Sequence, residues 1–229
     1  MSETSHSHIF VPATEPTVSS RAQQKRARIL ETAMRYFAHL GYEATRVSDI
    51  AQELGIAKGS IFQHFGSKDG LFLEAYKAAA RTFPAFLDAP QAAIQQGFFV
   101  VVRHHLAHAE QLKREHDIAY RIVLLGNYGS DLKVKKQINR FLLDEDPFGT
   151  LAFVSMGVQR DEIRSDLDQD LVVSVLDWTF ERFRDALLME EFDPGLFRRP
   201  GEAGGKAKED RIEEFVRVLR GAIGTERAS

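Results

Sequence analysis

The sequence contains no cysteine among its 229 residues. This absence excludes a disulfide framework and any thiolate metal site, and it fits a reducing cytoplasm. No stretch approaches the roughly 18 apolar residues needed to span a bilayer, and the N-terminus lacks a basic segment followed by an apolar run. We therefore expect a cytoplasmic protein with no membrane contact.

The net charge is only −3, so neither sign of charge dominates the chain as a whole. The charges are nevertheless unevenly distributed along it. Residues 19–77 hold nine Lys and Arg against six Asp and Glu, which leaves the remainder acidic. The hydrophobic share of 44% and the charged share of 28% are those of a globular protein. This partition favours an anionic partner for residues 19–77. The acidic remainder would repel that partner and so discourages it from wrapping around the rest of the chain.

Motifs of common enzyme classes are missing as well. The sequence has no phosphate-binding glycine loop, no nucleophile elbow and no His-Glu-x-x-His. An acidic series with calcium-loop spacing has Leu171 where that loop needs glycine, and it lacks the terminal Glu; its members are Asp166, Asp168, Asp170 and Asp177. We therefore predict that the chain is not an enzyme and that it holds no cofactor and no metal.

Residues 45–68 predict two short helices joined by a glycine turn. Thr45 is a suitable N-cap for a first helix from about Arg46 to Glu53, and Gly55 suits the left-handed residue that ends it. On the second helix Ile61 and Phe65 are four residues apart and face a core. The other faces then carry Lys58, Ser60, Phe62, Gln63 and His64.

These outward side chains suit DNA. Glutamine can pair with an adenine edge, whereas lysine, serine and histidine suit phosphate oxygens. Ser67 is expected to cap the next helix, and Lys68 in its first turn is placed to reach a phosphate. A first helix, ended by Gly41, begins with four basic residues, Arg21, Lys25, Arg26 and Arg28. This basic start is either a solvated face or a further phosphate contact.

Residues 21–82 resemble the DNA-binding domain of the TetR/AcrR family of transcriptional regulators. The resemblance rests on Gly41-Tyr42, Thr45, Asp49-Ile50-Ala51, Gly55, Lys58-Gly59-Ser60, His64-Phe65 and Ser67-Lys68. It departs from the family at Ala57, where Ser or Thr is usual, and at Phe62, where a phosphate-binding Tyr is favoured. The candidate DNA-binding residues are Thr45, Arg46, Lys58, Ser60, Phe62, Gln63, His64 and Lys68.

The resemblance implies an all-α homodimer with a three-helix, helix-turn-helix head and a larger helical body that senses a small molecule. We divide the chain into a disordered tail at 1–19, the DNA-binding head at 20–82 with its motif at 46–65, and a ligand-binding and dimerisation body at 83–229. His6 and His8 in the tail are expected to be solvated rather than metal ligands.

The body is expected to hold helices from Gln91 and over 117–126, 132–143, 148–158, 171–189 and 212–223, with a mobile loop at 193–206. The helix that leads from the head into the body is expected to run to about Thr82 and to be closed by Pro84. His104 and His108 lie four apart, which favours a polar face or a hydrogen bond in a pocket over a metal site. The candidate ligand-binding residues are Phe99, His104, Tyr120, Trp178 and Phe180.

The helix from Leu171 to Met189 is apolar around most of its girth, so it must be buried on more than one side. A second subunit is the simplest second partner, and with the preceding helix it would form a four-helix interface. The predicted interface residues are Leu171, Val172, Val175, Leu176, Thr179, Phe183 and Leu187.

These features predict a DNA-binding transcriptional regulator. We expect a repressor that leaves a palindromic, double-stranded operator when a small, mostly apolar effector binds the body. A ligand-independent DNA-binding protein is the alternative, and an enzyme is a weaker one. Neither the effector nor the operator sequence can be read from the residues.

Overall fold

The computed structural model describes residues 21–129, 132–193, 196 and 205–226. The tail with His6 and His8, and most of the loop at 193–206, therefore lie outside the described residues. The described part of the chain is helical without a β-strand, which confirms the all-α fold. No described helix is long and apolar enough to cross a bilayer.

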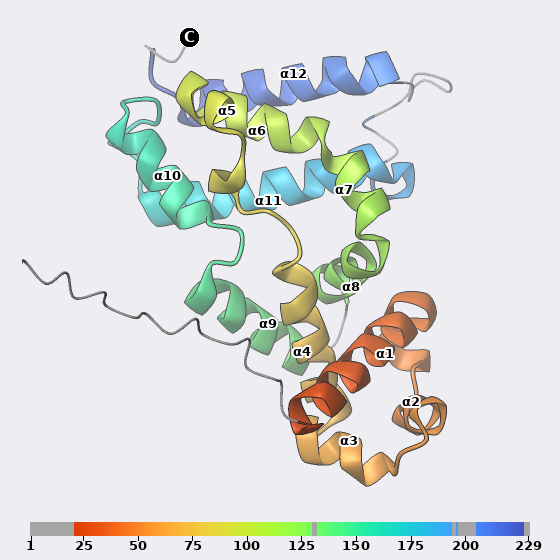
Figure 1. Ribbon diagram of the computed structural model, residues 1–229. Coiled ribbons are helices and arrows are strands. Elements are labelled where there is room, and N and C mark those ends of the chain that lie inside the picture. The colour runs from red at the N-terminus through yellow and green to blue at the C-terminus, as the bar shows by residue number, and fades with distance from the viewer. Residues whose placement is uncertain (1–20, 130–131, 194–195, 197–204, 227–229) are drawn as a thin grey trace, which may run out of the picture.

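The head comprises α1 (Arg21–Ala44), α2 (Val47–Leu54), α3 (Lys58–Phe65) and α4 (Lys68–Ala80) (Figure 1). After a short 3-10 turn, η1 (Phe86–Asp88), follow α5 (Gln91–Gln96), α6 (Phe98–Ala107), α7 (Ala109–Glu115), α8 (Asp117–Tyr128), α9 (Leu132–Glu145), α10 (Thr150–Gln159), α11 (Gln169–Leu188), η2 (Glu190–Phe192) and α12 (Gly205–Ile223).

Three expected helix boundaries are wrong. Gly41 (φ 79°, ψ 173°) kinks α1 but does not end it, because the chain returns to helix as far as Ala44. Gly97 (φ 115°, ψ 174°) breaks the single helix expected from Gln91 into α5 and α6. Side chains other than hydrogen are disfavoured at such positive φ values, so glycine suits both breaks. Helix α4 ends at Ala80, before Pro84 is reached.

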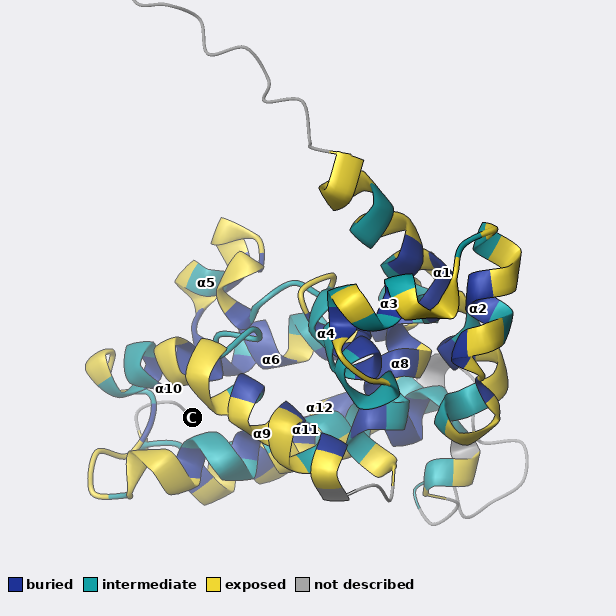
Figure 2. Cartoon of the chain, turned by 90° about the horizontal axis from the view of Figure 1, so that it is seen from below, coloured by how far each residue is buried: buried dark blue, intermediate teal, exposed yellow. Residues whose placement is uncertain are grey.

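Two hydrophobic cores organise the chain, and the first extends beyond the head. It joins α1–α4 to α8 and α9 through buried side chains such as Phe37, Tyr76, Ile122 and Ile138. We call α1–α4, α8 and α9 the lower unit. The second core joins η1, α5, α6, α10, α11 and α12, which we call the upper unit, around Phe98 and its neighbours. Figure 2 shows the buried residues on the inward faces of these helices.

Helices α4 and α8 pack closely against each other inside the lower unit. A Cβ atom added to Gly126 of α8 would lie 2.4 Å from the ring of Tyr76 in α4. The Tyr76 side chain is fully buried, and its hydroxyl donates a hydrogen bond to Oδ1 of Asn127 at 3.0 Å. Helix α4 is therefore held to α8 by close packing and by a buried polar contact.

Candidate nucleic-acid interface and body cavities

The short helices of the head fold locally as the sequence predicts. Gly55 ends α2 in the left-handed conformation (φ 64°, ψ 35°), and its N–H bonds to the last turn of that helix. Ile61 and Phe65 turn their side chains into the lower core. Ser67 caps α4, because its hydroxyl accepts a hydrogen bond from the N–H of Gly70 at 3.0 Å. Helix α3 is thus fixed by its inner face and leaves its outer face free.

Thr45 is the main correction in this motif. Arg46, not Thr45, occupies the N-cap position of α2, and no side chain caps that helix. Thr45 is only 1% exposed, and its hydroxyl donates to the carbonyl oxygen of Gly41 at 2.7 Å. This bond ties the start of α2 to the kink in α1. The Thr45 side chain is therefore a structural link and not a surface group that DNA can reach.

The other candidates on α3 differ in exposure. Lys58 and Gln63 are exposed, as is Arg46, whereas Ser60, Phe62 and His64 are half-buried. Phe62 packs partly on the lower core, and the Lys58 ammonium lies 5.5 Å from the centre of its ring. Arg46 and Lys58 form no ion pair within the described residues. The exposed donors among these candidates are consequently Arg46, Lys58 and Gln63.

Lys68 has neighbours within the head. Its ammonium donates to the carbonyl oxygen of Glu43 at 3.2 Å and lies 4.5 Å from the centre of the Tyr42 ring. Tyr42 in turn donates its hydroxyl proton to Asp69. Lys68 therefore fastens the start of α4 to the end of α1, and a phosphate would compete with these contacts.

The basic residues at the start of α1 likewise differ in whether they already have partners within the head. Arg26 forms an ion pair with Glu74 of α4 and lies over the Phe65 ring at 4.9 Å. Arg21 and Arg28 are exposed and have no ion pair among the described residues. Arg21 and Arg28 are thus accessible to an anionic partner, whereas Lys25 is half-buried.

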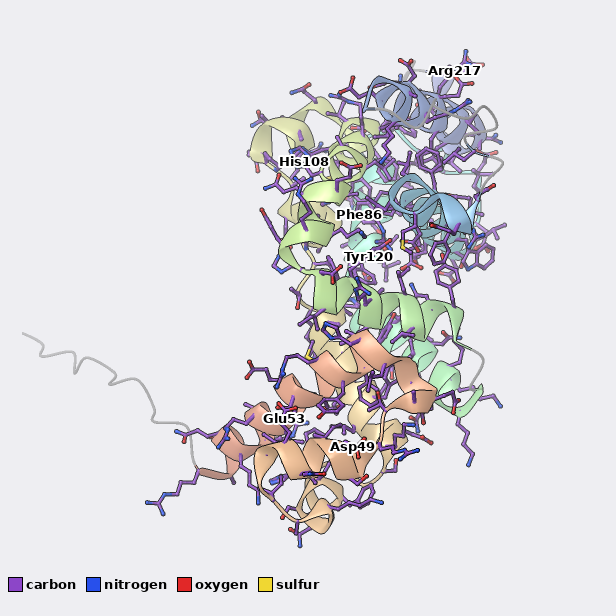
Figure 3. The ribbon with its side chains drawn as sticks, turned by 90° about the vertical axis from the view of Figure 1, so that its right-hand side faces the viewer. Asp49, Glu53, Phe86, His108, Tyr120 and Arg217 are labelled. Atoms are coloured by element: carbon purple, nitrogen blue, oxygen red, sulfur yellow. The ribbon has the colours of Figure 1, made fainter. Side chains whose placement is uncertain are left out.

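A cavity of about 60 Å³ lies where the lower and upper units meet. Figure 3 shows Phe86 of η1 and Tyr120 of α8 at this level, far from Asp49 and Glu53 in the head. The rings of Phe86 and Phe180 meet edge to face with centres 5.0 Å apart. The lining combines aromatic and polar side chains. The aromatic ones are Phe83, Phe86, Tyr120, Phe148 and Phe180, and the polar ones are His105, Lys113, Asp177, Glu181 and Arg184.

A second cavity of about 410 Å³ lies against the same stretch of α11. It is lined by Asn127, Tyr128 and Lys135 from the lower unit and by Trp178 and Arg182 from α11. Phe148, Asp177 and Glu181 line both cavities. These three residues form a common wall that a molecule can approach from either side.

The candidate ligand residues from the sequence are only partly brought together. Tyr120 and Phe180 line the smaller cavity, and Trp178 lines the larger. Phe99 is buried in the upper core beneath the Arg220 guanidinium, 4.9 Å from its ring centre, and lines neither cavity. His104 lies against His108, with ring centres 4.1 Å apart, and is likewise outside both cavities. Within the described residues no group of three metal-ligating side chains occurs.

His105, which the sequence did not single out, takes the place expected for His104. Its Nε2 lies 3.1 Å from the carbonyl oxygen of Phe86, and burial lowers the pKa of its imidazole. A neutral ring that holds η1 is therefore favoured. Sequence spacing alone does not distinguish two adjacent histidines when the helix is broken just upstream at Gly97.

Three carboxylates of α11 were also missed: Asp177, Glu181 and Asp185. Asp185 is fully buried and well satisfied. It accepts hydrogen bonds from the hydroxyls of Tyr120 at 3.0 Å and Tyr128 at 2.8 Å, and Arg184 pairs with it at 3.1 Å. Acids spaced by four in an otherwise apolar helix were the available signal, because they form a polar stripe that must face something other than a core.

Asp177 and Glu181 are less well compensated than Asp185. Burial raises the pKa of Asp177 to about 6, against a hydrogen bond that it accepts from the Thr150 hydroxyl at 2.7 Å. Burial also raises the pKa of Glu181, which accepts a hydrogen bond from Asn127 Nδ2 at 3.3 Å. Neither carboxyl has an ion-pair partner in the described part of the chain.

The predicted interface stripe on α11 is split between two environments. Val172, Leu176 and Leu187 are buried in the chain's own upper core, and Phe183 stacks on Phe215 of α12 with ring centres 4.1 Å apart. These side chains are therefore already covered, because the sequence pattern did not show which face meets the chain's own core. Leu171, Trp178 and Thr179 are exposed, and Val175 is half-buried. Trp178 is 66% exposed, and Leu151 of the neighbouring α10 is 51% exposed.

Comparison with known proteins agrees with this architecture. Residues 29–75 match the family described as bacterial regulatory proteins, tetR family. The HTH-type transcriptional repressor AcnR of Corynebacterium diphtheriae is 30% identical over 172 residues, which are 73% of this chain and 85% of AcnR. A stretch of 52 residues, 23% of this chain, is 46% identical to the HTH-type regulator YerO of Bacillus subtilis but spans only 18% of that protein.

Solved structures of this family also share the fold. A putative tetR family transcription regulator from Shewanella sp. PV-4 superposes with a TM-score of 0.62 at 17% identity, over 88% of this chain and 99% of the other. The helix-turn-helix head and the helical body are thus the family's architecture, and these relatives are transcription regulators rather than enzymes. The chain belongs to the TetR family of bacterial transcription regulators.

Proposed function

We propose that this regulator is a repressor that binds a palindromic operator as a homodimer and releases it when a small molecule occupies the cavities beside α11. The observation that carries the proposal is the place of the smaller cavity, between the unit that contains the head and the unit that contains α11. A ligand that fits better when the two units are spread must weaken DNA binding by the same factor by which DNA weakens the ligand.

A chain of polar contacts links the cavities to the head. Glu181 on the common wall accepts a hydrogen bond from Asn127 of α8, and Asn127 accepts one from Tyr76 of α4. Helix α4 begins directly after α3, so a shift of α4 moves the recognition surface. A coupling of about 1–3 kcal/mol between ligand and DNA would loosen the operator roughly 5- to 150-fold, which is enough for a switch.

Dimerisation is proposed through the outward faces of α10 and α11. Large apolar side chains gather there, with Leu151 on α10 and Leu171 and Trp178 on α11. An exposed apolar patch of this kind marks an interaction surface. Two recognition helices can enter successive major grooves when they lie about 34–36 Å apart, so the dimer sets the distance on which operator binding depends.

The DNA-binding part is tested with operator fragments selected from a random duplex library by the unmodified chain. Fluorescence anisotropy is then measured for Lys58→Ala, for Gln63→Ala and for Arg217→Ala as a matched control, because Arg217 lies at the opposite end of the molecule (Figure 3). Lys58→Ala should weaken binding to all sequences and lower the salt slope by about one charge. Gln63→Ala should relax base preference at one position in each half-site.

The ligand and dimer parts have separate tests. Operator affinity is measured with and without a ligand whose binding to the body has been established, and equal affinities would contradict the release mechanism. Sedimentation of Trp178→Glu should give monomers where the unmodified chain gives dimers, because a charge would be placed in an apolar contact. A stable monomer of the unmodified chain would refute the dimer.

A further inference from the structure

We propose that the cavities beside α11 take a small organic cation with an aromatic or apolar body, and that Asp177 and Glu181 are its counter-charges. This inference rests on the proposed function and deepens it, because it names the chemical class of the effector. The wall that the two cavities share presents both carboxyls, one helical turn apart on α11.

The charges of Arg184 and Lys135 act to lower the pKa of Glu181, but neither cation forms an ion pair with Glu181 or Asp177 within the described residues. Arg184 is half-buried and pairs instead with Asp185, which it contacts through both Nε at 3.2 Å and Nη2 at 3.1 Å. The Lys135 ammonium donates to the backbone carbonyl oxygens of Gly126 and Asn127. Asp146 also acts on Asp177 and raises its pKa through charge, while its own oxygens accept hydrogen bonds from the N–H groups of Thr150 and Leu151.

The two remaining cations lie at the edges of the cavities. Lys113 lies 5.9 Å from the centre of the Tyr120 ring, and Arg182 is exposed and lies over Tyr128 and Phe192. Neither forms an ion pair with Asp177 or Glu181 within the described residues. A buried carboxyl without a cation is costly, and a ligand that brings one removes this cost.

The walls supply the rest of the recognition. Phe83, Phe86, Phe148 and Phe180 line the smaller cavity together with the two carboxyls, and Trp178 and Tyr128 line the larger one with them. Aromatic faces attract a cation through the quadrupole of the ring and accept the apolar part of the ligand. An anionic ligand would meet the two carboxyls, and a neutral one would leave them unpaired.

The test compares three probes that share a benzyl or phenyl ring and differ in charge: benzylammonium, benzyl alcohol and benzoate. Binding to the full chain without DNA is followed by the fluorescence of Trp178, which is the chain's single tryptophan and lines the larger cavity. Benzylammonium should bind roughly 10- to 100-fold tighter than benzyl alcohol, the range that one charge-assisted hydrogen bond supplies. Benzoate should bind more weakly than benzyl alcohol.

Isosteric variants then assign the effect. Asp177→Asn and Glu181→Gln should each reduce the preference for benzylammonium over benzyl alcohol, and Asp170→Asn, an exposed acid in the first turn of α11, should retain it. Benzylammonium binding should also strengthen as the pH rises from about 5 to about 7.5, because both carboxyls must be ionised. Asp177→Asn should flatten this dependence.

Several outcomes overturn the inference. Benzylammonium that binds no tighter than benzyl alcohol, or that does not bind at all, contradicts a cation site. A preference that survives in both Asp177→Asn and Glu181→Gln contradicts the assignment to these carboxyls. Benzylammonium that binds as expected without changing operator affinity leaves the cation site standing and contradicts the ligand-controlled repressor instead, so the two failures are distinguishable.

Discussion

The joint between α4 and α8 gives the sharpest prediction on stability. Gly126→Ala places a methyl group 2.4 Å from the Tyr76 ring and 3.0 Å from the Ile138 side chain. Gly221→Ala is a matched control, since Gly221 also lies two residues before the end of its helix and an added Cβ there meets nothing within 4 Å. Both variants gain the same helix preference of alanine over glycine, at most about 1 kcal/mol.

The two variants therefore differ by the cost of overpacking alone. Tyr76 is fully buried and its hydroxyl is bonded to Asn127, so the ring has little room to move. Inserting a methyl group into such a site costs about 1–3 kcal/mol. Gly221→Ala should be neutral or more stable than the unmodified chain, and Gly126→Ala should be less stable than Gly221→Ala by about 1–3 kcal/mol. For a chain of this size the melting temperatures would differ by roughly 2–12 °C.

Urea and thermal unfolding, followed by circular dichroism at a fixed protein concentration, measure this difference. The concentration is fixed because dimerisation would contribute to apparent stability. If Gly126→Ala were as stable as Gly221→Ala, the joint would have room for a methyl group. The claim that close packing holds α4 to α8 would then be wrong.

Two further predictions concern the head helices α3 and α4. Ser67→Ala removes the hydroxyl that accepts from the Gly70 N–H, and it should lower the free energy of unfolding in urea by about 0.5–2 kcal/mol. Ala57→Ser should add a missing cap to α3 and raise that free energy. Equal stabilities of both variants and the unmodified chain would contradict the capping geometry. Tyr76→Phe removes the hydroxyl that donates to Asn127 and should reduce the effect of a bound ligand on operator affinity while leaving ligand affinity nearly unchanged. An unaltered ligand effect would exclude this contact from the coupling.

The head could be predicted from sequence because its signals are local. Gly55 as a left-handed cap, the inward pair Ile61 and Phe65, and the Ser67 cap each depend on a few neighbouring residues, and all three are confirmed. Thr45 was misplaced by one residue for the same reason. Threonine is a favoured N-cap and arginine is not, so side-chain preference points to Thr45. Only the kink at Gly41 shows that the threonine hydroxyl reaches a carbonyl oxygen of α1 instead.

The body was less predictable because its signals are tertiary. Helix α11 is apolar on several sides, and the sequence does not say whether Leu176 or Trp178 faces the chain's own core. The smaller cavity is assembled from η1, α6, α7, α8 and α11, which are distant in sequence. The pairing of α8 and α9 with the head, rather than with the other body helices, likewise depends on a shared core that no local pattern reveals.

A last prediction concerns the cost of keeping Asp177 ionised. Burial raises the pKa of this carboxyl from an ordinary value of 3.8 to about 6, so the folded chain binds its proton more tightly than the unfolded chain does. Protonated Asp177 therefore stabilises the folded state relative to the ionised group. This stabilisation is complete below about pH 3.8 and is lost as the pH rises through about 6. At pH 7.5 the ionised group should cost about 2–3 kcal/mol relative to a neutral side chain.

Asp177→Asn tests this cost, because its amide oxygen can still accept the hydrogen bond from the Thr150 hydroxyl. Measured by urea unfolding, the variant should be more stable than the unmodified chain at pH 7.5, and the advantage should shrink as the pH falls and vanish only below about 3.8. Titration of groups that do not interact with Asp177 cancels in the difference, whereas Asp146 and Glu181 feel its charge. Asp170→Asn should show no such trend. A flat difference, or a less stable Asp177→Asn at pH 7.5, would refute the reasoning. Confirmation would identify a buried acid that weakens the fold unless a cation is bound, which is the behaviour expected of a binding group.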